Sequence, residues 1–112
     1  MEVRAVAKNL GVSAQKMRLV VDLVRGKKVD DAINILRFTP TPSARLVAKV
    51  VKSAAANAEH NFQLDPDGLR IVKIYADVGT SLKRFRPRSR GQVSPIIKRS
   101  SHVTVIVAGE EV

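Results

Sequence analysis

The side chains best suited to bind a charged ligand are gathered in one stretch, LKRFRPRSRG, which occupies residues 82–91. Five of its ten residues are basic, namely Lys83, Arg84, Arg86, Arg88 and Arg90. The planar guanidinium group of arginine binds phosphate oxygens in pairs and is weakly hydrated. Because like charges at this density repel one another, we expect the stretch to face a polyanion.

The charge of the whole chain is concentrated around this stretch. From residue 78 to residue 109 there are seven basic residues, now including Lys98 and Arg99, and no acidic one. The remaining 80 residues carry 13 basic and 10 acidic side chains, so the segment holds seven of the ten net positive charges. Phosphate contacts position a protein on a nucleic acid but carry little sequence information. A basic surface that only maintains solubility is the alternative to a polyanionic partner.

Other kinds of chemistry find little support in the residue types. The chain has no cysteine, which excludes disulfides, thiolate metal sites and cysteine nucleophiles. His60 and His102 are the only histidines, and neither belongs to a cluster of ligands at metal spacing. We expect structural or hydrogen-bonding roles for both histidines. We interpret Asp65 and Asp67, which flank Pro66, as turn formers. The sequence therefore predicts no enzyme, no cofactor and no metal site.

The length of 112 residues is that of one domain with a modest core. No apolar run approaches the roughly 18 residues of a membrane span, and the N-terminal residues lack the apolar block of a signal peptide. We therefore expect a cytoplasmic protein without a membrane partner. Aromatic residues make up 4% of the chain, which weighs against a reader of single strands that stacks bases on aromatic rings.

A small α+β body is predicted to position the basic segment, with three helices packed on an antiparallel three-stranded sheet. Alternation of small and polar residues indicates a strand over residues 2–10. Runs rich in isoleucine and valine indicate strands over residues 69–78 and 103–108. Strict alternation in the second strand places Leu69, Ile71, Lys73 and Tyr75 on one face and Arg70, Val72, Ile74 and Ala76 on the other.

The three helices are predicted between the first two strands. Their expected N-caps are Ser13 for the first, Asp30 or Asp31 for the second, and Thr41 or Ser43 for the third. The first is predicted to end at Gly26 and the third near Asn61. The apolar stripes expected to face the core are Met17, Val20, Val21 and Val24 on the first helix, and Val47, Val50, Val51, Ala54 and Ala58 on the third.

The basic segment itself is predicted to be a long protruding β-hairpin over residues 79–102, with a body formed by residues 1–78 and 103–112. Folding residue 79 onto residue 102 puts the midpoint at Arg90–Gly91, where glycine can adopt a positive φ. Pro87 and Pro95 then fall on opposite arms, which a free ribbon allows because both of its strands are edges. A basic loop without regular structure is the alternative.

Three separated motifs carry a resemblance to a known family. They are Ser13-Ala14-Gln15-Lys16-Met17-Arg18 followed by Asp22-Leu23-Val24-Arg25-Gly26-Lys27; then Ala54-Ala55-Ala56-Asn57-Ala58-Glu59; then Lys83, four residues, Arg88-Ser89-Arg90-Gly91-Gln92, nine residues, and His102-Val103-Thr104-Val105-Ile106-Val107. In this order they resemble the large-subunit ribosomal protein family numbered twenty-two, in its bacterial-type form. Many members of that family have another basic residue where Gln92 stands.

The resemblance implies a structural constituent of the large ribosomal subunit whose partners are rRNA, neighbouring ribosomal proteins and the nascent polypeptide. It also implies that the hairpin passes through rRNA and that its tip lines the peptide exit tunnel. The implied rRNA-binding residues are Lys83, Arg84, Arg86, Arg88, Arg90, Lys98 and Arg99 on the hairpin, and Lys16, Arg18, Arg25 and Lys27 on the body. The implied tunnel-lining residues are Arg88, Arg90, Gly91 and Gln92.

Two alternatives stay open at this point. An architectural DNA-binding protein also uses a basic ribbon, which grips the minor groove. On the outer face of the third helix, Arg45, Lys49 and Lys52 either contact rRNA or form a solvated surface.

Overall fold

The computed structural model describes residues 2–79, 82–87 and 93–109, with the backbone alone for residues 82–87 and 93–98. Its elements along the chain are β1 (Glu2–Leu10), α1 (Ala14–Val24), α2 (Val29–Arg37), α3 (Pro42–Phe62), the 3-10 turn η1 (Pro66–Gly68), β2 (Arg70–Val78), β3 (Leu82–Pro87), β4 (Val93–Lys98) and β5 (Ser101–Ala108). The predicted α+β class and the order of its elements are confirmed. β2 begins one residue later than predicted, and β5 begins two residues earlier.

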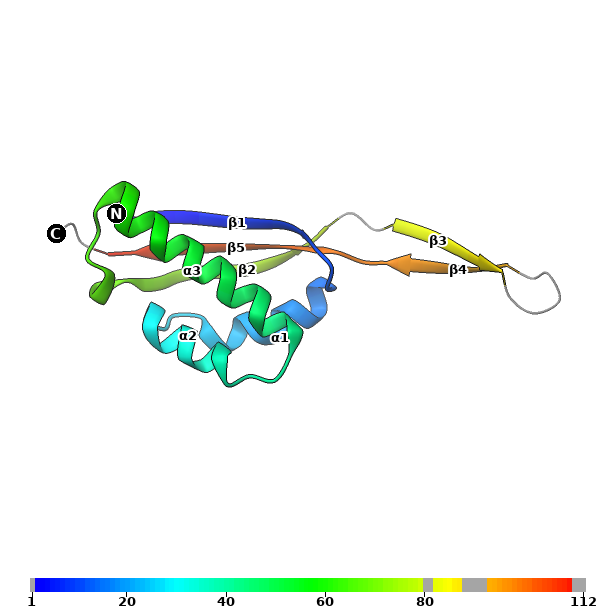
Figure 1. The fold of residues 1–112 in the computed structure, drawn as a ribbon, viewed down its shortest axis with the longest axis horizontal. Helices are drawn as coiled ribbons and strands as arrows, with labels where there is room; N and C mark the ends of the chain where they lie inside the picture. Colours follow the sequence, from blue (N-terminus) through cyan, green and yellow to red (C-terminus); the bar gives the residue numbers. More distant parts are fainter. Residues whose placement is uncertain (1, 80–81, 88–92, 110–112) are drawn as a thin grey trace.

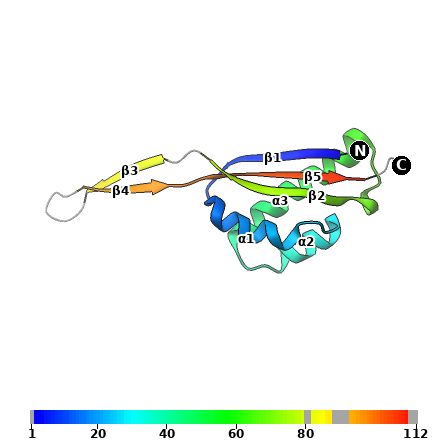
Figure 2. The ribbon, with the colours of Figure 1, turned by 180° about the vertical axis from the view of Figure 1, so that it is seen from behind.

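The body is a two-layer arrangement of helices on a sheet. Its three-stranded antiparallel sheet has the order β1-β5-β2, so the last strand of the chain lies in the middle and pairs with both others. All three helices cover one face of this sheet, as the two opposite views show (Figure 1, Figure 2). The other face carries no helix, so side chains on the sheet point either into the core or away from it.

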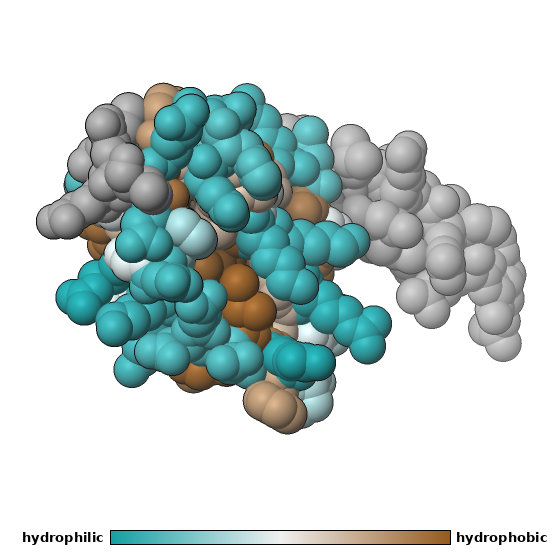
Figure 3. Space-filling model, turned by 60° about the vertical axis from the view of Figure 1, so that its left-hand side comes forward, coloured by the Kyte–Doolittle hydropathy of each residue, from teal (hydrophilic) through white to brown (hydrophobic). Residues whose placement is uncertain are grey.

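The core lies between the helices and the covered face of the sheet. Every residue of the two predicted helical stripes is buried, and the middle strand adds Val103, Val105 and Val107, which are fully buried. Burying a valine side chain stabilises the fold by about 1.5–3 kcal/mol relative to leaving it exposed. On the face drawn in Figure 3, hydrophilic residues cover most of the body, and apolar residues show mainly in a hollow between them.

The side chains of β2 that face the core change from odd-numbered to even-numbered residues halfway along the strand. Its register with β5 shifts between Ile71 and Lys73, which makes Val72 the additional residue of an irregularity. The buried side chains on the two sides of this point are Leu69, Ile71, Ile74 and Ala76. The strict alternation predicted for this strand is therefore wrong, because one inserted residue moves all following side chains to the opposite face.

The helix ends lie near their predicted positions, although not every predicted cap forms. Thr41 is the N-cap of α3, and its Oγ1 accepts a hydrogen bond from the Ala44 N–H at 3.3 Å. Ser13 is the N-cap of α1, but its hydroxyl makes no capping hydrogen bond. Gly26 follows α1 with a φ of 77°, a left-handed conformation that glycine adopts without steric cost.

Acidic residues lie in the first turn of α2 and in the turn that follows α3. The N-cap of α2 is Lys28, so the prediction that Asp30 or Asp31 caps this helix is wrong. Both carboxylates instead lie in the first turn of α2, where the helix dipole favours negative charge. The predicted turn after α3 is confirmed, because Asp65 Oδ1 accepts a hydrogen bond from the Asp67 N–H at 3.0 Å.

The backbone of β3 and β4 forms the arms of the predicted hairpin. The two strands pair antiparallel from Leu82↔Lys98 to Pro87↔Val93 as a separate two-stranded sheet. This ribbon extends beyond the body, and the molecule measures 66 Å along its longest axis against 25 and 17 Å along the others (Figure 1). At its root, the Gly79 N–H donates to the Ser100 carbonyl at 2.9 Å. The predicted turn at Arg90–Gly91 lies outside the described residues.

Candidate nucleic-acid interface

Five of the seven predicted RNA-binding residues of the hairpin lie in or next to its two described arms. Three of them, Lys83, Arg84 and Arg86, belong to β3. Lys98 ends β4, and Arg99 follows it as an exposed residue. The predicted tip residues Arg88, Arg90, Gly91 and Gln92 lie outside the described residues. The ribbon thus places cationic residues on both arms, away from the hydrophobic core.

The two body arginines predicted to bind RNA also hold α1 against β2. Arg18 Nε donates to the Ala76 carbonyl at 3.2 Å, and Arg25 Nη2 donates to the Ile74 carbonyl at 3.1 Å. Arg25 Nη1 also contacts the carboxylate of Asp22 at 2.6 Å. Because both arginines remain exposed at the surface, each keeps further N–H groups for another ligand.

These arginines contribute to the protection of an edge strand. β2 is the outer strand of the sheet, and such strands present unpaired backbone groups to solvent. Near the start of β2, the segment 27–29 supplies partners: the Val29 N–H donates to the Leu69 carbonyl at 3.0 Å, and the Ile71 N–H donates to the Lys27 carbonyl at 2.9 Å. Beyond the irregularity at Val72, Arg18 and Arg25 supply the donors. Sequence reasoning missed this structural use, because it depends on the spatial neighbour of α1.

The two lysines predicted to bind RNA near α1 are differently placed. Lys16 is exposed on α1, and the side chain of Lys27 is exposed just after the helix. The structure shows no hydrogen bond from either ammonium group, so both are available to a phosphate. Their role in RNA binding stays a prediction, as does that of the two arginines.

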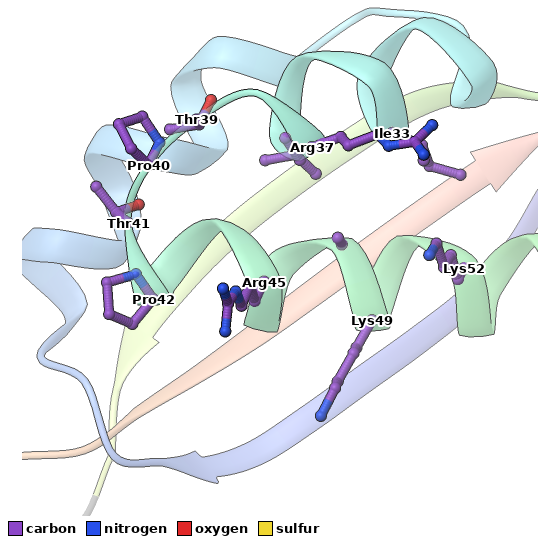
Figure 4. A pocket seen from close by; sticks show the side chains of 11 residues that line it. Ile33, Arg37, Thr39, Pro40, Thr41, Pro42, Arg45, Lys49 and Lys52 are labelled. Carbon is purple, nitrogen blue, oxygen red and sulfur yellow. The ribbon is translucent and has the colours of Figure 1, made fainter.

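A second cationic surface was only partly foreseen. A groove of about 970 Å³ lies between α2 and the first half of α3, and we call it the α2–α3 groove. Its lining residues are Ile33, Leu36, Arg37, Thr39, Pro40, Thr41, Pro42, Arg45, Ala48, Lys49 and Lys52. Figure 4 shows Arg37 on α2 and the other three cations following one another along α3. The sequence pattern indicated the row on α3 but not its meeting with Arg37.

The face of the sheet without helices also carries exposed side chains. Across β1, β5 and β2 the register aligns Arg4 with Ile106 and Lys73, and Val6 with Thr104 and Tyr75. Arg4 and Lys73 are exposed at the two edges of this face. The sequence did not predict this surface of basic and apolar side chains, because the irregularity in β2 decides which residues of that strand lie on the uncovered face.

The two histidines belong to different elements, His60 to α3 and His102 to β5. His102 Nδ1 accepts a hydrogen bond from the Asn9 N–H at 3.0 Å, which confirms a hydrogen-bonding role. Asn9 has a φ of 56°, in the left-handed region, where β1 departs from its regular register. His60 lies exposed in the last turn of α3. Within the described part of the chain, no three His, Cys, Asp or Glu residues form a group able to hold a metal ion.

None of the helices described by the structure is long and apolar enough to cross a membrane.

Comparison with known proteins agrees with the resemblance carried by the motifs. Residues 5–108 match the family described as ribosomal protein L22p/L17e. A protein named large ribosomal subunit protein uL22 from Dehalococcoides mccartyi is 63% identical over 108 residues, covering 96% of this chain and 99% of the relative. Proteins of the same name from Latilactobacillus sakei and Desulforamulus reducens are 53% and 52% identical, covering 96% and 99% of this chain and 92% and 98% of the relatives. The chain therefore belongs to the ribosomal protein L22p/L17e family.

Proposed function

We propose that this protein is a structural constituent of the large ribosomal subunit, on ribosomes in the cytoplasm, and that it binds rRNA. Membership of a ribosomal family and the names of its relatives support this proposal. The observation that carries it is the basic ribbon, because a segment with seven basic residues and no acidic one extends beyond a compact body. Solubility depends on net charge and does not require the charge to be concentrated in one segment, whereas an RNA partner neutralises such a concentration.

The hairpin acts in this proposal as an anchor between RNA segments. Two-stranded ribbons are marginally stable alone in water, so phosphate contacts along both arms add stability to the paired strands. Arginine predominates because its guanidinium binds phosphate bidentately. The anchoring residues are Lys83, Arg84, Arg86, Arg88, Arg90, Lys98 and Arg99, with body contacts from Lys16, Arg18, Arg25 and Lys27.

The proposal divides the chain into a body, residues 1–78 and 103–112, and a hairpin, residues 79–102, within one domain. The tip residues Arg88, Arg90, Gly91 and Gln92 line the nascent-peptide exit tunnel in this arrangement. Its partners are then large-subunit rRNA, neighbouring ribosomal proteins and the nascent polypeptide. No described residue requires a catalytic role.

Sedimentation of the tagged full-length protein with ribosomal subunits at moderate and high salt tests the assembly role. The triple variant Lys83→Gln, Arg84→Gln and Arg86→Gln is expected to leave the large subunit at lower salt than the wild type. The matched control changes the same number of charges on the uncovered sheet face, at Arg4 and Lys73 and at Lys8, which is exposed four residues after Arg4 on β1. Recovery of the wild-type protein with the nucleoid instead of the large subunit would support the DNA-binding alternative and refute the proposal.

The tunnel assignment needs a separate test. A photoreactive amino acid replacing Arg90 is expected to crosslink to a nascent chain stalled on the ribosome. The same amino acid replacing Lys49, on the body, is expected to give no such product. Crosslinking from position 90 only to soluble proteins outside the ribosome would contradict a tip buried in the tunnel.

A further inference from the structure

The α2–α3 groove brings together cations from two elements that are separate in sequence. Arg45, Lys49 and Lys52 are spaced four and three residues apart, so they follow one side of α3. At 1.5 Å per residue they span about 10 Å of the helix axis. Arg37, in the last turn of α2, lines the opposite bank (Figure 4). A row of this kind matches an elongated anion better than a single small one.

The groove cations are not neutralised by the protein itself. All four are exposed, and no acidic residue is among the eleven lining residues. The ion pair found among the described residues joins Arg25 to Asp22, on α1. Four neighbouring positive charges without counter-charges repel one another, and binding of a polyanion removes that repulsion.

We propose that the α2–α3 groove is a second RNA site, which holds a phosphate backbone segment independently of the hairpin. This inference rests on the proposed function, because it takes rRNA as the polyanion available to the protein. It assigns a binding role to Arg37, Arg45, Lys49 and Lys52. It also decides the alternative left open for the outer face of α3 in favour of RNA contact.

The apolar part of the groove argues against a protein as the occupant. Leu36 is only 2% exposed because the core already covers it. Ile33 and Ala48 are half-buried, and none of the large apolar side chains that the described structure exposes lines the groove. Protein partners draw most of their binding energy from apolar or aromatic anchors that enter a pocket. The exposed apolar residues of the lining are Pro40 and Pro42, so the exposed part of the groove lacks a large aliphatic or aromatic side chain, whereas its four charges suit phosphate.

One end of the groove is fixed before any ligand binds. The Thr39 hydroxyl donates to the Ile35 carbonyl at 2.7 Å, and Thr41 caps α3. Pro40 and Pro42 restrict the backbone between the two helices. A wall held in this way lowers the entropy that binding must remove. The long cationic side chains are then the main groups that become ordered on contact with RNA.

The salt dependence of RNA binding tests the proposal on the full-length protein. The probe is protein-free large-subunit rRNA, and the logarithm of the binding constant is measured against the logarithm of salt concentration. Each neutralised phosphate contributes a slope of about −0.7 to −0.9. Replacing Arg45, Lys49 and Lys52 by glutamine is expected to reduce the magnitude of the slope by about 2–3. All three residues are exposed, so the variant is expected to fold, which its unfolding curve checks.

Two other triple variants distinguish a failure of the groove site from a failure of the proposed RNA binding. Glutamine at Lys83, Arg84 and Arg86 tests the hairpin, and glutamine at Arg4, Lys8 and Lys73 tests the uncovered sheet face. A reduced slope for the hairpin variant with an unchanged slope for the groove variant overturns the groove site alone. Unchanged slopes for both refute RNA binding by the protein as proposed. Equal reductions for the groove and sheet-face variants reveal an effect of net charge and also overturn the groove site.

The chemical identity of the neighbour provides the second readout. A photoreactive amino acid replacing Pro40, an exposed residue of the groove lining, is incorporated into assembled large subunits. The expected product is a crosslink to rRNA. A crosslink to another ribosomal protein, or no product with any subunit component, overturns the proposal.

Discussion

The two arginines that join α1 to β2 allow a quantitative test of how the body is held together. Replacing Arg18 and Arg25 by methionine removes the donors but keeps an aliphatic chain of similar length. A hydrogen bond from a charged group contributes about 1.5–3 kcal/mol when well buried. Because the Arg25 side chain is 52% exposed, solvent competes for its donors. We therefore expect about 1 kcal/mol of lost stability at each position.

The two losses are expected to add. Arg18 lies on α1 and Arg25 directly follows the last residue of that helix, and the two side chains contact different carbonyl groups. The exposed pair between Arg25 and Asp22 adds little, because such surface ion pairs contribute about 0–1 kcal/mol. The double variant should therefore unfold with a free energy about 2 kcal/mol below the wild type.

Urea unfolding of the free protein, followed by circular dichroism, measures this difference. The control is Lys16→Met, which removes the same charge from the same helix at a residue for which the structure shows no hydrogen bond. It should change the unfolding free energy by no more than about 0.5 kcal/mol. If the double variant is as stable as this control, Arg18 and Arg25 do not support the body, and the edge of β2 must be protected in another way.

Three further changes test the core, a helix cap and the root of the hairpin by thermal or urea unfolding. Met17→Ala should lower the free energy of unfolding by about 2–5 kcal/mol, because the Met17 side chain is fully buried. Its control, Leu19→Ala, should change that free energy little, because Leu19 is 70% exposed. Similar losses for the two variants would contradict the predicted core. Thr41→Ala should lower the free energy of unfolding by about 1 kcal/mol, because it removes a capping hydrogen bond. Ser13→Ala should have a smaller effect, because the Ser13 hydroxyl makes no such bond. Equal effects would refute the difference between the two caps. Gly79→Ala should lower the free energy of unfolding by about 1–3 kcal/mol. The added Cβ would lie 2.6 Å from the hydroxyl oxygen of Ser100 and 3.2 Å from its carbonyl carbon. A variant as stable as the wild type would show that the backbone at the root of the hairpin adjusts to the added methyl group.

Local sequence patterns predicted the elements of this fold well because each pattern reports a short-range requirement. The apolar stripe of α3 repeats with the helical period, and all of its predicted residues are buried. Thr41 and Gly26 mark helix ends because their side chain or backbone conformation serves the nearest unpaired groups. The hairpin arms followed from flanking strands and from prolines that only an edge strand tolerates.

Features that depend on distant neighbours could not be predicted in the same way. No local signal marked the irregularity at Val72, which arises from the pairing of β2 with β5. Arg18 and Arg25 looked like free cations because the carbonyl groups that they contact lie about fifty residues further along the chain. Arg37 had no assigned role until the structure placed it across a groove from α3.

The sequence by itself determined the family, the α+β class and the concentration of positive charge between residues 78 and 109. These follow from composition and short-range periodicity, which tertiary contacts do not alter. Only the tertiary structure decided which cations are engaged by the protein and which are available to a ligand. That division depends on packing: the docking of α1 on β2 uses the guanidinium groups of Arg18 and Arg25, while the meeting of α2 and α3 leaves four cations without counter-charges in one groove.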